Sequence, residues 1–318
     1  MKAVILDGYT ENPGDLSWEA LESLCDLTVY ERTPYDKRIE RCKDADILIV
    51  NKVPVDEELL SACPQIRYVC VLATGFNIID AEAAKRHGVK VANIPTYGTD
   101  AVAQFAIAML LEICHHVGHH SDAVHEGRWA TSDDWCFWDY PLIELAGKTM
   151  GIIGFGRIGK ATGRLARALG MDVIAHDTYA NGQQEDWYSM VELEDIWNRS
   201  DVIALHCPLT ETTNEIINRE SISQMKDGVI ILNNSRGPLI NESDLADALN
   251  GGKVYAAGLD VVSEEPIREN NPLLKCDNCI ITPHISWAPK ESRQRLMDIA
   301  VENVRTFIEG NPANIVIG

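Results

Sequence analysis

The chain has 318 residues, of which 46% are hydrophobic and 24% charged, as is ordinary for a globular protein with enough chain for two domains. Its 28 basic and 48 acidic side chains give a formal net charge of −20 at pH 7. A surface this acidic repels nucleic acid and anionic membranes, so neither is an expected partner. An anionic small molecule would need a locally positive pocket, which makes arginines in candidate sites informative.

The sequence predicts neither a signal peptide nor a membrane span. Residues 1–7 are typical of a first strand that ends at an acid, and the longest apolar run is too short to cross a bilayer. The nine cysteines are scattered, and Cys70 and Cys114 lie inside apolar runs, a usage typical of reduced thiols in a cytoplasm. The C-x-x-C at 276–279 has no second pair, so no metal site is expected there.

Residues 1–98 alternate short apolar runs with segments of helical periodicity, the pattern of a parallel α/β unit. The loop Leu72–Asn77 follows the fourth of these runs, at the sheet edge where open parallel sheets bind ligands. Backbone N–H groups beside Gly75 could hold a carboxylate there, and an ordinary turn is the alternative. The expected strands are 2–7, 27–30, 46–50, 66–71 and 90–94, with helices at 16–24 and 56–62.

A long helix is predicted at 101–120, because this stretch is alanine-rich and apolar around most of its surface. Burial between layers is therefore expected. The helix ends in four histidines, His115, His116, His119 and His120, in which pairs four residues apart could share a metal. No third ligand or H-E-x-x-H glutamate accompanies them, so a solvated or interface helix end is favoured.

Residues 127–141 contain five aromatic side chains with little helical or strand regularity. A loop this apolar must be buried against something. A subunit interface is the favoured explanation, and packing within the chain is the alternative.

The most informative motif is TMGIIGFGRIGKATGRLARALGMDVIAHD, at residues 149–177. A buried strand leads into a G-x-G-x-x-G turn, then a helix that ends at Gly170 and a second strand that ends at Asp177. Gly154 permits the tight turn, Gly156 lets the backbone approach a pyrophosphate, and Gly159 lets the helix pack on the strand. Asp177 follows at close to the spacing of about 20 residues expected for the acid that binds a ribose diol. The motif predicts NAD in preference to NADP.

Beyond Asp177 the alternation continues, with strands expected at 201–205, 229–232, 255–259 and 280–281 and helices at 193–197, 244–250 and 293–309. Each strand ends in polar residues, which parallel strands bring to one edge of a sheet, beside the dinucleotide. Three residues there are chemically complementary. Arg236 offers a bidentate fork for a carboxylate, His284 can transfer a proton near neutral pH, and Glu265 would keep that histidine protonated. The set suits hydride transfer to a 2-keto acid.

The motifs NSRGPLIN, GLDVVSEEP and TPHISWAP, in that order after GFGRIG, resemble those of the D-isomer-specific 2-hydroxyacid dehydrogenases. The segments PTYGTDAVAQ, GRW and ELAGKTMGIIGFGRIG are most similar to the glycerate dehydrogenase (hydroxypyruvate reductase) branch. The resemblance implies an α/β homodimer of two Rossmann-like, doubly wound domains. An NAD-binding domain at 99–287 would be inserted in a substrate-binding, flavodoxin-like domain at 1–98 and 288–318, whereas the sequence alone predicts two consecutive domains.

The resemblance also implies individual roles. Arg236 would be catalytic, Glu265 would pair with His284, and His284 would be the acid and base. Thr74, Gly75, Arg236 and Trp287 would bind the substrate. NAD would be held by Gly154, Gly156, Arg157, Ile158, Gly159, Asp177, Cys207, Pro208, Asn234, Ser235 and Asp260.

The favoured substrate pair is hydroxypyruvate and D-glycerate, because Trp287 would crowd a phosphate. Glu265 argues against the formate-oxidising relatives, which carry glutamine there. Asn77 replaces a common acid and Pro289 a common small hydroxyl residue, so the fine substrate preference stays open. Glyoxylate, pyruvate or an aromatic keto acid is the alternative. An NADH-sensing corepressor-like binding protein is a further alternative, although the partner-binding tails of those proteins are not found.

Overall fold

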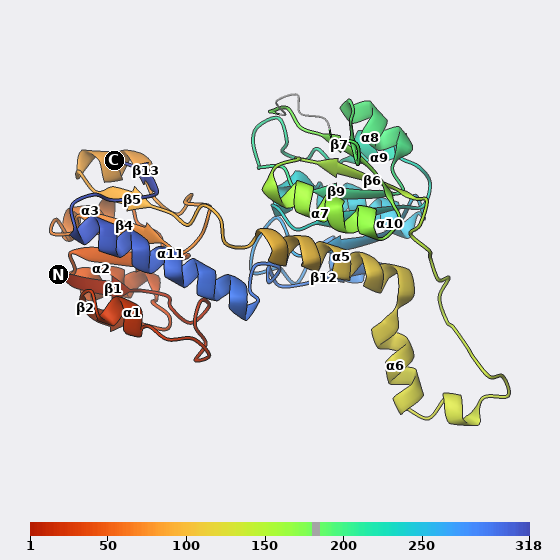
Figure 1. Cartoon of the computed structure of the whole chain (residues 1–318), viewed down its shortest axis with the longest axis horizontal. Coiled ribbons are helices and arrows are strands. Elements are labelled where there is room, and N and C mark those ends of the chain that lie inside the picture. Colours follow the sequence, from red (N-terminus) through yellow and green to blue (C-terminus); the bar gives the residue numbers. More distant parts are fainter. Residues whose placement is uncertain (180–184) are drawn as a thin grey trace. The chain divides into compact units, whose positions relative to one another are not determined.

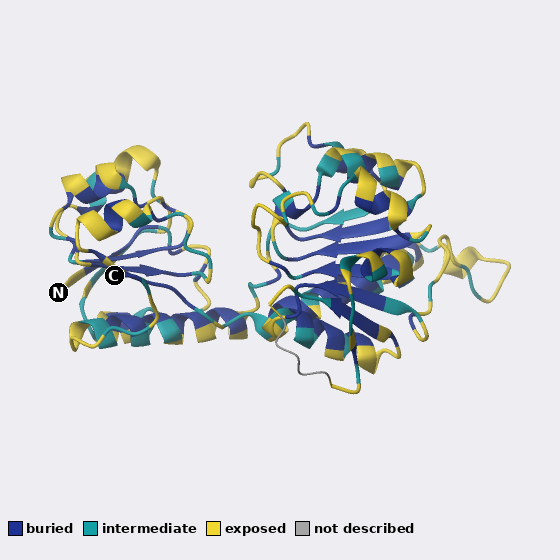
Figure 2. Cartoon of the chain, turned by 90° about the horizontal axis from the view of Figure 1, so that it is seen from above, coloured by how far each residue is buried: buried dark blue, intermediate teal, exposed yellow. Residues whose placement is uncertain are grey.

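The computed structural model describes residues 1–179 and 185–318 and divides into two compact units (Figure 1). Unit 1 comprises Met1–Gly98 and Trp287–Gly318, and unit 2 comprises Thr99–Ser286. Each unit is a largely parallel sheet with helices on both faces, which confirms the predicted α/β, doubly wound class. In Figure 2 the strands are buried within each unit while the outer helix faces are exposed.

Unit 1 contains a six-stranded sheet in the order β13-β5-β4-β3-β1-β2, in which β13 is antiparallel to β5 and the other pairs are parallel. Side chains alternate between two cores: Ala3 and Ile5 face one, Val4 and Leu6 the other. A strand that is buried on both faces in this way needs apolar residues at consecutive positions. The strands are β1 (Lys2–Ile5), β2 (Asp26–Val29), β3 (Ile47–Val50), β4 (Tyr68–Val71), β5 (Lys90–Ala92) and β13 (Ile315–Ile317).

Two groups of helices cover the sheet of unit 1. Residues of α2, α3 and α4 share a buried cluster with Val4 and Leu48, and residues of α1 and α11 share another with Ile5 and Tyr68. Asp56 and Asp80 cap α3 and α4 by accepting hydrogen bonds from N–H groups of the first turn. The helices are α1 (Glu19–Glu22), α2 (Arg38–Cys42), α3 (Glu57–Ala62), α4 (Ala81–Arg86) and α11 (Lys290–Ile308), with a short 3-10 helix η1 (Tyr35–Lys37).

A buried carboxyl group lies in the loop after β1. Glu11 has no exposed surface, accepts a hydrogen bond from Asn51 Nδ2, and its backbone oxygen accepts one from Arg293 Nη1 at 3.0 Å. Its Oε2 has no hydrogen-bond partner among the described residues. Burial, reinforced by the charge of Asp7, raises the pKa of Glu11 from 4.5 to about 8. The folded protein therefore holds Glu11 protonated at neutral pH.

This burial predicts that the protein loses stability as the pH rises from about 5 to about 8, because the unfolded chain ionises Glu11 in that range and the folded chain does not. The free energy of unfolding should fall by at most about 1.4 kcal/mol per pH unit from this group. Denaturant unfolding of wild type and Glu11→Gln at pH values across that range measures it. Glu11→Gln should gain on wild type as the pH rises. The exposed Glu31→Gln is the control, and parallel curves for all three proteins would contradict the prediction.

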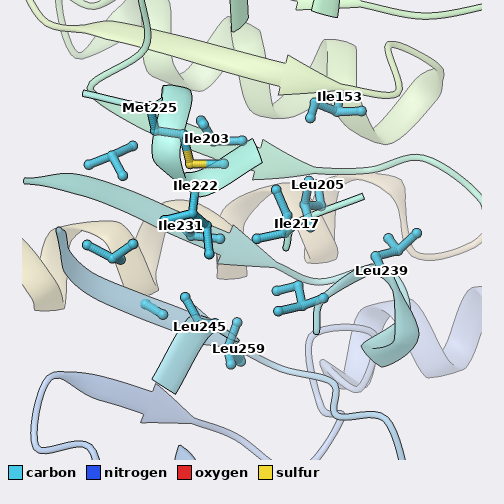
Figure 3. Packing of buried hydrophobic residues seen from close by; sticks show 14 of the residues in the cluster. Ile153, Ile203, Leu205, Ile217, Ile222, Met225, Ile231, Leu239, Leu245 and Leu259 are labelled. Carbon is cyan, nitrogen blue, oxygen red and sulfur yellow. The ribbon is translucent and has the colours of Figure 1, made fainter. Parts of the chain in front are cut away.

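Unit 2 contains a seven-stranded parallel sheet in the order β12-β11-β10-β9-β6-β7-β8. Figure 3 shows one of its two cores, where Ile203, Leu205 and Ile231 of the strands meet side chains from the covering helices. The strands are β6 (Thr149–Ile153), β7 (Asp172–His176), β8 (Ser189–Met190), β9 (Val202–Leu205), β10 (Val229–Asn233), β11 (Val254–Leu259) and β12 (Cys279–Ile281).

The helices of unit 2 also form two layers. Residues of α8 (Leu193–Arg199), α9 (Arg219–Gln224) and α10 (Glu242–Asn250) belong to the core of Figure 3, and residues of α5 (Thr99–His115) and α7 (Arg157–Ala168) belong to the core on the opposite face. Gly170, with φ +83°, ends α7 as the sequence predicts. Short 3-10 helices η2 (Trp129–Thr131), η3 (Gly237–Leu239) and η4 (Pro272–Lys275) complete the unit.

The prediction of a single helix at 101–120 is wrong. His116 adopts a left-handed conformation (φ 46°, ψ 46°), which ends α5 and starts a second helix, α6 (Val117–His125). The predicted burial holds for α5, whereas Ala123 is the buried side chain of α6. Among the described residues no single helix is long and apolar enough to cross a membrane. Together, α5 and α6 have the length and composition of a span, but a bend of 57° separates them.

Residues 117–142, here called the arm, extend away from the sheet of unit 2 (Figures 1 and 2). Two tryptophans of the arm are not buried within the chain, since Trp135 is 85% and Trp138 63% exposed. Two histidines of the predicted cluster contact Asp139 and so connect α6 to the rest of the arm. His119 Nε2 lies 2.6 Å from Asp139 Oδ2, and the Asp139 N–H lies 3.2 Å from His120 Nε2. Arg128 donates two hydrogen bonds to Asp139 and lowers the pKa of that carboxyl.

Candidate active site

The G-x-G-x-x-G turn connects β6 to α7, and its three glycines meet different constraints. A Cβ on Gly154, whose φ is +90°, would lie 2.3 Å from the Cys207 backbone nitrogen. A Cβ on Gly159 would lie 2.2 Å from the Gly154 carbonyl oxygen, so the helix could not pack against the turn. A Cβ on Gly156 would meet nothing within 4 Å. The open side of the turn is therefore at Gly156, where a pyrophosphate could approach the backbone at the helix N-terminus.

Asp177 follows β7 and holds this turn. Its Oδ2 accepts a hydrogen bond from the Phe155 N–H at 2.6 Å, and its Oδ1 accepts one from the Tyr179 N–H at 2.8 Å. The carboxylate is thus fixed beside the glycine turn, where a ribose diol could donate to it. Its charge would repel a 2′-phosphate at the same position.

The carboxyl ends of β9 and β10 bring together further predicted cofactor residues. Ser235 Oγ donates to the Cys207 carbonyl at 2.7 Å, which joins the two strand ends. Asn234 is 9% exposed, and its Oδ1 has no hydrogen-bond partner within the described ranges. A buried amide oxygen without a donor suits a ligand that carries one. Burial raises the pKa of the Cys207 thiol to about 11, so this cysteine is an uncharged packing group. The predicted Pro208, next in the chain, is exposed.

Arg236 lies in a tight turn between β10 and η3. The side chain of Asn233 fixes this turn, because its Nδ2 donates to the Arg236 carbonyl at 2.9 Å and its Oδ1 accepts from the Ser235 N–H at 3.0 Å. The guanidinium is exposed, and its Nη1 donates to the Ser235 carbonyl at 2.7 Å. The remaining donors of the fork can bind a carboxylate.

His284 follows β12 and is paired with Glu265. Its Nδ1 lies 2.7 Å from Glu265 Oε2, which leaves Nε2 as the atom that can exchange a proton with a substrate. The residue has a left-handed backbone (φ 54°), and its N–H donates to the Asp260 carbonyl at 2.8 Å. Such a backbone conformation is rare in residues other than glycine. It sets the direction in which the His284 side chain leaves the loop after β12.

Asp260 holds that loop in place. It is fully buried, and its carboxylate accepts hydrogen bonds from Thr282 Oγ1 at 2.6 Å, the Ile285 N–H at 2.9 Å and the Ser286 N–H at 2.8 Å. These contacts make Asp260 the support of the His284 loop, and the NAD contact that the resemblance implies for it stays a prediction.

The model of the D-isomer-specific 2-hydroxyacid dehydrogenase NAD-binding domain matches residues 107–286. The chain belongs to the D-isomer-specific 2-hydroxyacid dehydrogenases. It is 63% identical, over 99% of both chains, to a hydroxypyruvate reductase of Blautia hydrogenotrophica. It is 39% identical to a glycerate dehydrogenase of Methylorubrum extorquens, over 87% of each. A crystal structure of the D-lactate dehydrogenase of Aquifex aeolicus, complexed with NAD and lactic acid, superimposes with a TM-score of 0.82 at 30% identity, covering 100% of this chain and 99% of that one.

The matched residues fall within unit 2, so unit 2 of this dehydrogenase contains the segment that matches the NAD-binding domain of the family. Its residues fit the cofactor. The turn is open at Gly156, and Arg157 and Ile158 begin the helix behind it. The Asp177 carboxylate after β7 supplies one acceptor, and the Asn234 oxygen after β10, which has no partner in the described part of the chain, supplies another.

The other predicted substrate residues of the dehydrogenase belong to unit 1. Thr74 Oγ1 donates to the Ile94 carbonyl at 2.7 Å, and Asn93 Nδ2 donates to the Thr74 carbonyl at 2.7 Å, which fixes the loop that contains Gly75. Trp287 packs edge-on against Tyr97, with ring centroids 6.4 Å apart. Their contacts with substrate stay a prediction.

Two supports of the site were not predicted. Asn233 and Asp260 each end a strand as a buried polar residue, and each bonds a turn that carries a predicted catalytic residue. A polar residue at the end of an apolar strand is the sequence signal that could have identified them. That signal alone does not distinguish a support from a ligand contact.

Proposed function

We propose that this dehydrogenase interconverts hydroxypyruvate and D-glycerate, with NAD as its cofactor. The observation that carries the proposal is the 2.7 Å contact between His284 and Glu265, held at the sheet edge that carries the glycine turn. The similarity to a hydroxypyruvate reductase over the whole chain supports the choice of substrate.

The proposed chemistry assigns one task to each residue. NADH supplies the hydride that reduces the keto carbon. Arg236 binds the substrate carboxylate through its guanidinium fork. His284 donates the Nε2 proton to the oxygen that becomes the hydroxyl, and the Glu265 carboxylate holds the ring through Nδ1. In the oxidation direction His284 accepts the same proton.

Unit 1 is proposed as the substrate-binding domain. The Thr74–Gly75 backbone would hold the substrate carboxylate together with Arg236, and Trp287 would restrict the substrate to small acids. The proposal is supported by the position of the Thr74 loop at the carboxyl end of β4, the edge at which open parallel sheets bind ligands.

NAD is proposed to be preferred over NADP because of Asp177. Replacing Asp177 with asparagine removes the charge and keeps an oxygen that can accept from the Phe155 N–H. The ratio of kcat/KM with NADPH to that with NADH should then rise at least about tenfold. Asp177→Ala should also relax the preference but weaken binding of both cofactors, because the turn loses its anchor. An unchanged ratio in both variants would remove the basis for the assignment.

The arm is proposed to bury its aromatic side chains against a second copy of the chain, which gives a homodimer. Its support is the exposure of Trp129, Trp135 and Trp138 on a segment braced by Asp139. Sedimentation at the mass of a single 35.3 kDa chain would contradict it. A cytoplasmic location is proposed from the nine free thiols in the described chain.

The test of the proposed function is NADH oxidation by the purified protein with hydroxypyruvate, glyoxylate and pyruvate in parallel, with NADPH as the control. The expected result is fastest turnover with hydroxypyruvate and NADH. Glyoxylate as the best substrate would favour the alternative. Binding of NADH without turnover of any keto acid would overturn the enzymatic role.

A further inference from the structure

The loop that carries Glu265 has neither helix nor strand of its own. It runs from Val262 to Asn271, ahead of η4. Glu265 lies near its beginning, and its Oε1 accepts from the Val262 N–H at 3.4 Å, a long hydrogen bond. The position of this loop decides whether Glu265 meets His284 at the 2.7 Å distance of their contact.

One carboxylate bonds both ends of this loop. Glu242 Oε1 accepts from the Ser263 N–H at 2.7 Å, and Glu242 Oε2 accepts from Ser263 Oγ at 2.7 Å. Glu242 Oε2 also accepts from Asn271 Nδ2 at 3.0 Å. Hydrogen bonds to a charged acceptor are stronger than those between neutral groups. The start and the end of the loop are thus fixed to a single side chain.

Glu242 is itself held on a rigid element. It is the first residue of α10, whose Leu245 and Leu249 are buried in the core of unit 2. The preceding residue, Asn241, caps the helix by accepting from the Asp244 N–H at 3.1 Å, and its own N–H donates to the Ile217 carbonyl at 2.8 Å. The carboxylate is therefore presented from a fixed helix end.

The start of the loop, at Val262 and Ser263, packs against the turn that carries Arg236. A Cβ on Gly237 would lie 1.9 Å from the Val262 carbonyl carbon and oxygen and 2.4 Å from the Ser263 nitrogen. The two backbones touch because residue 237 lacks a side chain. The backbone of Ser263 thus lies between Glu242 and the turn that carries Arg236, which ties the position of Glu265 to that of the proposed carboxylate-binding group.

We propose that Glu242 is a positioning residue for the reaction: by fixing Ser263 and Asn271 it sets the position of Glu265 against His284 Nδ1. The inference rests on the proposed function, because it assigns Glu242 an effect on proton transfer. Glu242 acts through Glu265 and touches neither substrate nor cofactor.

The test compares Glu242→Gln with wild type for kcat/KM across the pH range, NADH affinity and thermal midpoint. We expect kcat/KM for keto-acid reduction to fall roughly 10- to 100-fold. The pH profile of this rate should also shift, because a displaced Glu265 no longer contacts His284 Nδ1 at a fixed distance. NADH affinity should stay near wild type, since the glycine turn is unchanged.

Two further variants separate position from charge. Asp247→Asn is the control for charge: it removes another carboxylate of α10, one that pairs with Arg219. This variant should leave the pH profile unchanged. Ser263→Ala keeps every charge, including Arg236 and the Glu264–Arg268 pair, and removes one of the three hydrogen bonds to Glu242. It should shift the profile in the same direction by less.

The possible failures differ. If wild type turns over keto acids and Glu242→Gln has an unshifted pH profile, with or without a lower thermal midpoint, Glu242 is a structural residue and the inference is wrong. Should Glu242→Gln fail to fold, an unshifted profile for Ser263→Ala decides against it in the same way. Wild type without activity on any keto acid overturns the proposed function instead.

Discussion

Replacing His284 with asparagine or alanine is expected to lower kcat/KM for hydroxypyruvate reduction by about 10³-fold, the middle of the range for loss of a general acid. The ring that would supply the proton is removed, and Glu265 is left without the 2.7 Å partner that holds it. Asparagine is the sharper variant, because it tolerates the left-handed backbone of this position better than alanine does. Steady-state NADH oxidation measures the loss.

Two measurements separate this effect from damage to the fold. NADH affinity and thermal midpoint should stay near wild type in His284→Asn, since the glycine turn and Asp177 are unchanged. His125→Ala, at an exposed histidine of the arm, should retain full activity. Loss of NADH binding in His284→Asn would contradict the assigned role, as would retention of more than about a tenth of the activity.

Replacing Gly156 with alanine is expected to weaken NADH binding by roughly 10²-fold, the cost of an added methyl group in a tightly fitting site. The new Cβ meets no protein atom within 4 Å, and Gly156 has an ordinary φ of −74°, so alanine fits the folded protein. The methyl group would instead occupy the side of the turn that a pyrophosphate approaches. Fluorescence titration with NADH measures the effect.

The other glycines supply the comparison. Gly159→Ala places a Cβ 2.2 Å from the Gly154 carbonyl oxygen, so it should lower both the thermal midpoint and NADH affinity. Gly118→Ala adds the same methyl group to α6, 3.6 Å from Glu112, and should leave NADH affinity unchanged. NADH affinity equal to wild type in Gly156→Ala would show that the cofactor does not approach the turn from this side.

Local patterns in the sequence predict most of the fold. Short continuous apolar runs identify β1, β3 and β4, and the glycine turn with Asp177 identifies β6, α7 and β7 as one unit. The break at His116 was not predictable from periodicity, because α5 and α6 together carry an unbroken run of helix-compatible residues. The pairing of β13 with β5 joins residues more than two hundred positions apart, so the sequence alone predicts consecutive domains instead.

For the candidate site, sequence gives the residues that end strands, and only the structure gives what each of them bonds. Arg236 and His284 stand out because their chemistry is recognisable at a strand end. Glu242 does not, since its partners Ser263 and Asn271 lie 21 and 29 residues further along the chain. The pairing of Glu265 with His284 is predicted by chemical complementarity and by the resemblance to a family, because nothing in the spacing of 19 residues requires that contact.

The arm contains three of the seven tryptophans, Trp129, Trp135 and Trp138, and all three are exposed. Indoles in water emit at longer wavelengths than indoles in an apolar environment. The fluorescence of these tryptophans therefore reports whether the arm is covered. Dilution of the protein should shift the emission to longer wavelengths if the arm loses a covering partner. Trp197, buried in unit 2, supplies a component whose emission does not depend on concentration.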